Sequence, residues 1–142
     1  MASDAISRLD NDPLIAVVGA TDTPGKYGGI VYRNLKEKGY RVVAVNPSRS
    51  TVDGDPTVAT ITDIQPEPDI VTLVVPPTRT LSVLDEVAGF EDAAVWIQPG
   101  AADEEVRDKL DELGLMAVLD ACIMVVSQPR PDRDIFDSSA AQ

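Results

Sequence analysis

The stretch Ile15-Ala16-Val17-Val18-Gly19-Ala20-Thr21-Asp22-Thr23-Pro24-Gly25-Lys26 decides the fold of this chain. Four consecutive apolar residues run directly into a glycine-containing loop, which is typical of a strand buried on both faces that ends in a strand-to-helix turn. A helix is expected next, over Tyr27 to Lys38, with Gly39 as its stop signal. The first N–H groups of such a helix have no partner within it, and its dipole adds partial positive charge, so the turn suits a phosphate. Lys26 would add a full charge, which suggests a nucleotide-type ligand.

Two well-known phosphate motifs fail here on spacing. The dinucleotide fingerprint G-x-G-x-x-G needs a second glycine two residues after Gly19, and the next glycine is Gly25. The P-loop needs four residues between its glycines and Ser or Thr after the lysine, whereas five residues separate these glycines and Tyr27 follows Lys26. Nucleotide hydrolysis is therefore disfavoured, and a plain tight turn of an α/β protein stays open as the alternative.

The charge of the chain is unusual, because 24 acidic residues face 12 basic ones and give a net charge of −12. Such a chain repels nucleic acid and anionic membranes, so neither is expected as a partner. Self-repulsion lowers stability in dilute buffer and salt relieves it, which favours a salt-rich cytoplasm as in a halophile over an acidic mesophilic protein.

Length and composition exclude several other classes. A chain of 142 residues is one ordinary domain, and its apolar runs are far shorter than the roughly 20 residues of a membrane span. The polar start carries no apolar signal core, so a cytoplasmic protein is expected. One cysteine rules out an internal disulfide, and with no histidine there is almost nothing to bind zinc or another soft metal, so no metal site is expected.

Short apolar runs alternate with helical patterns along the chain. Strands are expected near 15–18, 41–45, 69–75, 93–98 and 116–119, and helices near 27–38, 79–88 and 103–113. This alternation predicts an α/β fold: a single doubly wound parallel sheet, Rossmann-like, of five strands in the order 3-2-1-4-5, with helices on both faces. Residues 1–13 are expected to form an arm or short helix, 14–128 the domain and 129–142 a flexible acidic tail, with 51–58 as a loop or short extended piece.

Ligands of such sheets bind at the carboxyl ends of the strands, across the switch point that we expect between strands 1 and 4. The second strand ends in Asn46 instead of the carboxylate that NAD enzymes use on the ribose diol. Three residues later, Arg49 lies between Ser48 and Ser50 and offers a cation with hydroxyls where a ribose phosphate would lie. This favours a phosphorylated ribose, as in NADP or coenzyme A, although a solvated loop arginine is the open alternative.

The later strand ends suggest contacts to uncharged parts of a ligand. Pro76 and Pro77 would form a rigid apolar shelf for an adenine or a pantetheine arm, or would simply end the strand. Gln98 suits an amide or carbonyl, because the three acids at 103–105 would repel a phosphate from the helix that follows. No serine or cysteine has a visible base, so no enzymatic activity is expected, and Cys122 is expected to be an inert buried residue.

Several motifs together resemble one known family. They are Gly19-Ala20-Thr21-Asp22-x-Pro24-x-Lys26, Gly39-Tyr40-x-Val42, Val45-Asn46-Pro47, Trp96-Ile97-Gln98-x-Gly100, Gly114-Leu115 and Asp120-x-Cys122. Over residues 14–122 the chain resembles the stand-alone CoA-binding domain proteins, and it is similar to the CoA-binding domain of the succinyl-CoA synthetase alpha subunit. By that resemblance Arg49 would stand in for a lysine at the ribose phosphate. The catalytic phospho-histidine domain of the synthetases has no counterpart here, so the resemblance implies no ligase activity.

The resulting hypothesis is a protein that binds coenzyme A or an acyl-CoA at the strand ends and has no catalytic residues. An NADP-dependent oxidoreductase, or a regulatory or partner subunit with a vestigial cleft, is the alternative, and a homo-oligomer stays possible. The cofactor-binding residues expected are Gly19, Ala20, Thr21, Asp22, Thr23, Lys26, Asn46, Pro47, Ser48, Arg49, Val75, Pro76, Pro77, Gln98, Pro99 and Gly100.

Overall fold

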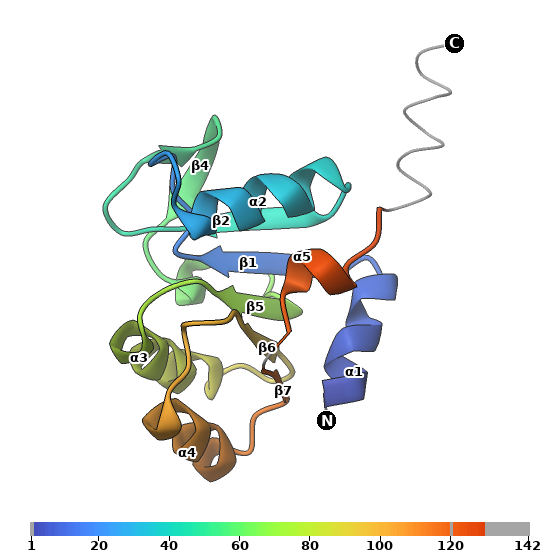
Figure 1. The fold of residues 1–142 in the computed structure, drawn as a ribbon, viewed down its shortest axis with the longest axis vertical. Coiled ribbons are helices and arrows are strands. Elements are labelled where there is room, and N and C mark those ends of the chain that lie inside the picture. Colours follow the sequence, from blue (N-terminus) through green and yellow to red (C-terminus); the bar gives the residue numbers. More distant parts are fainter. Residues whose placement is uncertain (1, 120, 130–142) are drawn as a thin grey trace.

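The computed structural model describes residues 2–119 and 121–129. Within these residues the chain forms a seven-stranded sheet with helices around it, and Figure 1 shows β2, β1, β5 and β6 side by side. In chain order the elements are α1 (Ala2–Ser7), the 3-10 helix η1 (Arg8–Asp10), β1 (Leu14–Val18), α2 (Tyr27–Glu37), β2 (Arg41–Val45), β3 (Thr51–Val52), β4 (Asp55–Val58), the 3-10 helix η2 (Ile61–Asp63), β5 (Ile70–Leu73), α3 (Pro77–Val87), β6 (Ala94–Ile97), α4 (Glu104–Leu113), β7 (Ala117–Val118) and α5 (Ile123–Val126).

The sheet order is β3-β4-β2-β1-β5-β6-β7, and every neighbouring pair is parallel except β3 with β4. The parallel α/β fold is as predicted, but the five-strand count and the expected order are wrong. The strand expected third, now β5, pairs directly with β1, with Ile15 opposite Ile70 and Val18 opposite Leu73. The switch point therefore lies between β1 and β5, and not between β1 and the strand Ala94–Ile97.

The expected order puts the third expected strand, which is β5 in the structure, beside β2. In the structure β4 occupies that position. Thr57 lies opposite Ala44, and the antiparallel strand β3 adds the outer edge. The turn between β3 and β4 is Asp53-Gly54, with φ of 52° and 80°. Asp-Gly tolerates this left-handed backbone, which is why it closes a two-residue hairpin. Residues 51–58, expected to be a loop or short extended piece, thus form two strands, which are the third and fourth of the sheet in chain order.

Two separate hydrophobic clusters cover the two faces of the sheet. Because side chains alternate along a strand, Ile15 and Val17 of β1 face one cluster and Ala16 and Val18 the other. The first cluster contains apolar residues of α1, α2 and α5, and the second contains those of α3 and α4. These four residues are 0–1% exposed. Burial on both faces explains the unbroken apolar run that marks β1 in the sequence.

The N-terminal residues pack against the sheet. Ala5 and Leu9 are buried in the first cluster, and Arg8 donates hydrogen bonds to the carbonyl oxygens of Asp69 and Asp92 at 2.9 and 2.8 Å. The expected acidic tail lies outside the described residues from 130 onward. Among the described helices none has the length and apolar character that crossing a bilayer requires, and no cluster of three or more potential metal ligands occurs in this part of the chain.

Candidate functional site

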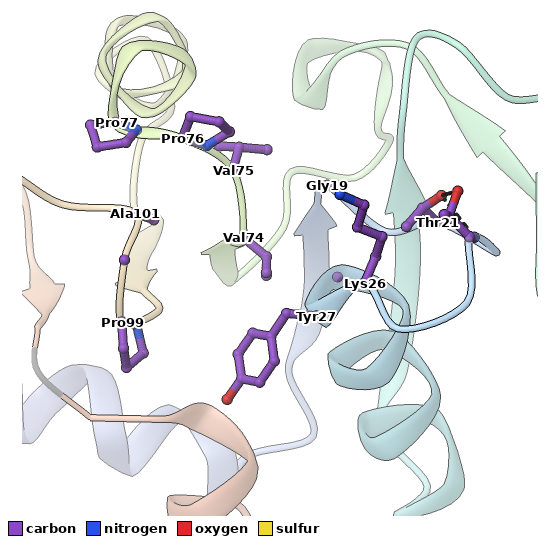
Figure 2. A pocket seen from close by; sticks show the side chains of 13 residues that line it. Gly19, Thr21, Lys26, Tyr27, Val74, Val75, Pro76, Pro77, Pro99 and Ala101 are labelled. Carbon is purple, nitrogen blue, oxygen red and sulfur yellow. Dashed lines mark hydrogen bonds between the residues drawn. The ribbon is translucent and has the colours of Figure 1, made fainter.

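A pocket of about 810 Å³ opens at the carboxyl edge of the sheet, beside the switch point between β1 and β5. Figure 2 shows Lys26 and Tyr27 on one side of this cavity and Pro99 and Ala101 on the other. Its lining consists of Gly19, Thr21, Thr23, Lys26, Tyr27, Gly28, Val74, Val75, Pro76, Pro77, Pro99, Gly100 and Ala101.

Glycines allow the loop after β1 to lie against both of its neighbours. Gly19 has a φ of +100°, and a Cβ there would lie 2.4 Å from the carbonyl oxygen of Val74. A Cβ on Gly28 would lie 1.9 Å from the carbonyl oxygen of Gly19. Distances this short exclude any side chain unless the backbone moves. The start of α2 is therefore pressed directly onto the turn that ends β1.

The N-terminus of α2 is open to an anion. Its N-cap residue, Lys26, has an extended backbone and makes no side-chain cap, and the first turn contains no acidic residue. The helix has 11 residues, so its first N–H groups and its dipole give a site of partial positive charge beside the Lys26 amine. By contrast, Asp103 caps α4 by accepting a hydrogen bond from the N–H of Val106, and two glutamates complete that first turn.

The opposite part of the pocket is apolar. Val74 and Val75 leave β5 and are followed by Pro76 and Pro77, where α3 begins. Pro99 to Ala101, which follow β6, form the facing wall. The pocket thus combines a cationic helix start with an apolar trough, which suits a ligand that carries phosphates at one end and a long, weakly polar arm at the other.

Nine of the sixteen expected site residues line this pocket, and seven do not. The nine are Gly19, Thr21, Thr23, Lys26, Val75, Pro76, Pro77, Pro99 and Gly100, and the seven are Ala20, Asp22, Asn46, Pro47, Ser48, Arg49 and Gln98. Ala20 is fully buried in the core. Ser48 and Arg49 border a shallow hollow of about 250 Å³ with Ser50 and Thr51, and Pro47 is exposed next to it.

Asn46 and Asp22 join the loops after β1 and β2. The Asn46 amide donates to the carbonyl oxygen of Ala20 at 2.9 Å and accepts from the N–H of Ser48 at 2.8 Å. Asp22 forms an ion pair with Arg49, with 3.4 Å between the carboxylate oxygen and the guanidinium nitrogen. These contacts place the Arg49 hollow next to the loop that lines the main pocket.

Gln98 faces the protein and not the pocket. Its side chain is 1% exposed, its carbonyl oxygen accepts from the N–H of Ile123 at 2.9 Å, and its amide nitrogen lies 3.3 Å from the sulfur of Cys122. The amide group expected to bind a ligand therefore holds the start of α5. Asp120, which belongs to the Asp120-x-Cys122 motif, lies outside the described residues.

Cys122 is half-buried and not buried as expected, and its sulfur lies 3.0 Å from the hydroxyl oxygen of Tyr27. Its expected inertness stays a prediction. Burial opposes ionisation of the thiol, but hydrogen bonds from Tyr27, Gln98 and the N–H groups of Met124 and Val125 outweigh it and lower the pKa of Cys122. The hydrogen bond to Cys122, together with burial, raises the pKa of Tyr27.

Tyr27 is a pocket residue that the sequence analysis missed. Its ring forms part of the wall, and its hydroxyl reaches the sulfur of Cys122, which is 95 positions later in the chain. Its place immediately after Lys26, at the first position of the helix that follows the turn, is the signal that could have identified it.

The comparisons with known proteins agree with this geometry. The sequence model of a family described as "CoA binding domain" matches residues 14–128. The uncharacterized protein YneT of Bacillus subtilis is 29% identical over 117 residues, which cover 82% of this chain and 87% of that protein. An ADP-forming acetate–CoA ligase of Archaeoglobus fulgidus is 25% identical over 134 residues, but these cover 86% of this chain and only 19% of the ligase.

Solved structures show the same fold. A conserved hypothetical protein from Pyrococcus furiosus has a TM-score of 0.73 at 37% identity, with 78% of this chain and 96% of that chain covered. A hypothetical protein from Pyrococcus horikoshii has a TM-score of 0.79 at 31% identity, with 89% of each chain covered. These relatives are similar in size to the present chain, whereas the ligase is several times longer.

Proposed function

The chain belongs to the family of CoA-binding domains, and from this premise we propose that it binds coenzyme A or an acyl-CoA in the pocket between β1, β5 and β6. One observation carries the proposal: a single cavity contains both a helix N-terminus and an apolar trough. The N-terminus of α2 has no acidic residue in its first turn and lies next to Lys26, and the trough extends from Val74 to Pro77. Coenzyme A has the matching parts, a pyrophosphate and a long pantetheine arm.

The geometry supports one direction for the ligand. The pyrophosphate would lie over the first turn of α2, where backbone N–H groups and the Lys26 amine can contact it. The pantetheine arm would follow the apolar wall toward Pro99 and Ala101. The adenosine end would point toward the loop after β2, where Arg49 would meet the ribose phosphate.

Binding without catalysis is the activity that we propose. The chain has no histidine and one cysteine, and the thiol of that cysteine is engaged by Tyr27 and Gln98. In the ligase of Archaeoglobus fulgidus the matching region is a small part of a much longer chain. A carrier or partner role in the cytoplasm therefore fits the present chain better than ligase activity of its own.

Thermal unfolding with a panel of ligands tests the proposal. A ligand at 100 times its Kd adds about 2.7 kcal/mol of stability, which for a domain of this size raises the midpoint by about 5 to 10 °C. We expect this shift with coenzyme A and acetyl-CoA, and no shift with NAD or NADP. A shift with NADP alone would make the chain an oxidoreductase component, and no shift with any of them would mean that the cleft is vestigial.

A further inference from the structure

One acidic side chain stands where a phosphorylated ligand would have to approach. The Asp22 carboxylate lies 3.4 Å from the Arg49 guanidinium, and the two side chains are 35% and 38% exposed. The cation proposed to meet the ribose phosphate is therefore already paired with an anion, and that anion belongs to the loop that lines the main pocket.

The carboxylate is held more firmly than the guanidinium. The other oxygen of Asp22 accepts a hydrogen bond from the N–H of Asp53 at 2.8 Å. Asp53 lies in the hairpin turn that Lys36 of α2 ties down through ion pairs to Asp53 and Asp55 at 3.0 and 2.9 Å. Asp22 is thus held by the hairpin turn, which is itself tied to α2.

Within the described residues, the side chain of Arg49 makes only long contacts. Its guanidinium lies 3.4 Å from Asp22 and 3.5 Å from the carbonyl oxygen of Thr51, both at the outer limit of a hydrogen bond. A phosphate could draw the Arg49 side chain toward itself, whereas Asp22 would keep its place on the Asp53 N–H. The phosphate and the carboxylate would then share one guanidinium, roughly 6 Å apart, and would repel each other.

We propose that Asp22 is a specificity-determining residue that weakens the preference of this site for a phosphorylated ribose. The inference rests on the proposed function, because it concerns the ribose phosphate of a bound CoA. At an effective dielectric constant between those of water and of the protein surface, the repulsion corresponds to a factor of about 5 to 20 in Kd. Dephospho-CoA lacks this phosphate and does not meet the carboxylate.

The test measures the Kd of CoA and of dephospho-CoA by titration calorimetry for the wild type and Asp22→Asn. Asparagine keeps an oxygen acceptor for the Asp53 N–H and removes only the charge. CoA should bind Asp22→Asn about 5- to 20-fold more tightly than it binds the wild type, while dephospho-CoA should change less than about 2-fold.

A matched control removes one negative charge elsewhere. Asp85 pairs with Lys109 at 2.8 Å between α3 and α4, about two helical turns from the pocket end of α3. Asp85→Asn should leave both affinities within about 2-fold, which separates a local effect from the change in net charge. Should Asp22→Asn fail to fold, Asp22→Ser keeps a short polar side chain on the loop and carries the same expectation.

The outcomes are distinct. If Asp22→Asn leaves CoA binding unchanged or shifts both ligands equally, the inference is wrong. If it weakens CoA alone, Asp22 positions Arg49 and does not oppose the phosphate, which also overturns the inference. Binding of neither ligand to the wild type would refute the proposed function, and the inference would fall with it.

Discussion

Replacing Gly28 with alanine should show how closely the ligand site depends on the contact between α2 and the turn after β1. A Cβ at this position would lie 1.9 Å from the carbonyl oxygen and 2.7 Å from the carbonyl carbon of Gly19. Both atoms are backbone, so the turn or the helix must shift by about 1 Å, and overpacking of this kind costs about 1 to 3 kcal/mol. Helix propensity alone would predict the opposite sign, because alanine in a helix is about 1 kcal/mol better than glycine.

Calorimetric unfolding and CoA titration measure the two consequences of Gly28→Ala. We expect the midpoint to fall by about 3 to 10 °C and CoA to bind at least about 10-fold more weakly, because the first N–H groups of α2 move away from the phosphate. Gly89→Ala is the control, since a Cβ there would meet only the carbonyl oxygen of Glu86 at 3.4 Å, an ordinary contact. Unchanged or increased stability of Gly28→Ala with normal CoA binding would refute the assignment of the phosphate to this helix start.

Three further predictions concern charge. Lys26→Ala should weaken CoA and dephospho-CoA by the same factor, whereas Arg49→Ala should weaken CoA alone by about 10- to 150-fold in calorimetric titrations; equal losses for Arg49→Ala would disprove its contact with the ribose phosphate. The pH profile of Cys122 alkylation should give a pKa below the usual 9.0, and Tyr27→Phe should move it upward, so identical profiles would contradict the proposed hydrogen bond. The thermal midpoint should rise as KCl goes from 0.1 M to about 2 M, because screening relieves the −12 charge, and a flat midpoint would remove the halophile hypothesis.

The parallel sheet was predictable because β1 and its turn carry strong local signals. Ile15 to Val18 are buried on both faces, which produces an unbroken apolar run, and the turn continues into a helix with a glycine stop. Residues 55–58 carry no such signal, because Pro56 is exposed and the other three are only partly buried. The Asp53-Gly54 turn is the local signal for a hairpin and predicts that β3 pairs with β4, but it does not specify that β4 lies beside β2.

The site was harder to predict because side-chain direction is set by contacts between distant segments. Gln98 does follow β6 at the ligand edge, as the sequence indicates. Its amide, however, is occupied by Ile123 and Cys122, 25 and 24 positions away. Because the Gln98 side chain is only 1% exposed, its amide oxygen and its amide nitrogen both need hydrogen-bond partners. The N–H of Ile123 in α5 is the partner of the oxygen, and the sulfur of Cys122 is the partner of the nitrogen. The hydrophobic periodicity of the sequence contains no information about this contact between the end of β6 and the start of α5.

The same limit applies to Arg49. Its sequence context, between two serines in the loop after β2, predicts an anion site, and that prediction is untested; the ion pair with Asp22 depends on how the first loop folds over the second. Charged residues in a loop are usually solvated, so the sequence alone offers no reason to expect that Asp22 neutralises Arg49.

If this strongly acidic protein binds coenzyme A as proposed, the site needs positive potential that does not come from many basic side chains. Here the helix starts can supply this potential, because α2 and α3 both begin at the pocket without an acidic residue in the first turn. By contrast, α4 is capped by Asp103 and has Glu104 and Glu105 in its first turn. Helix-end dipoles act within about one turn, so they attract a phosphate locally without changing the net charge. Under the halophile hypothesis the surface acids would keep the protein soluble in salt. The proposed ligand site and the acidic surface would be compatible because the helix dipoles act over a shorter distance than the net charge.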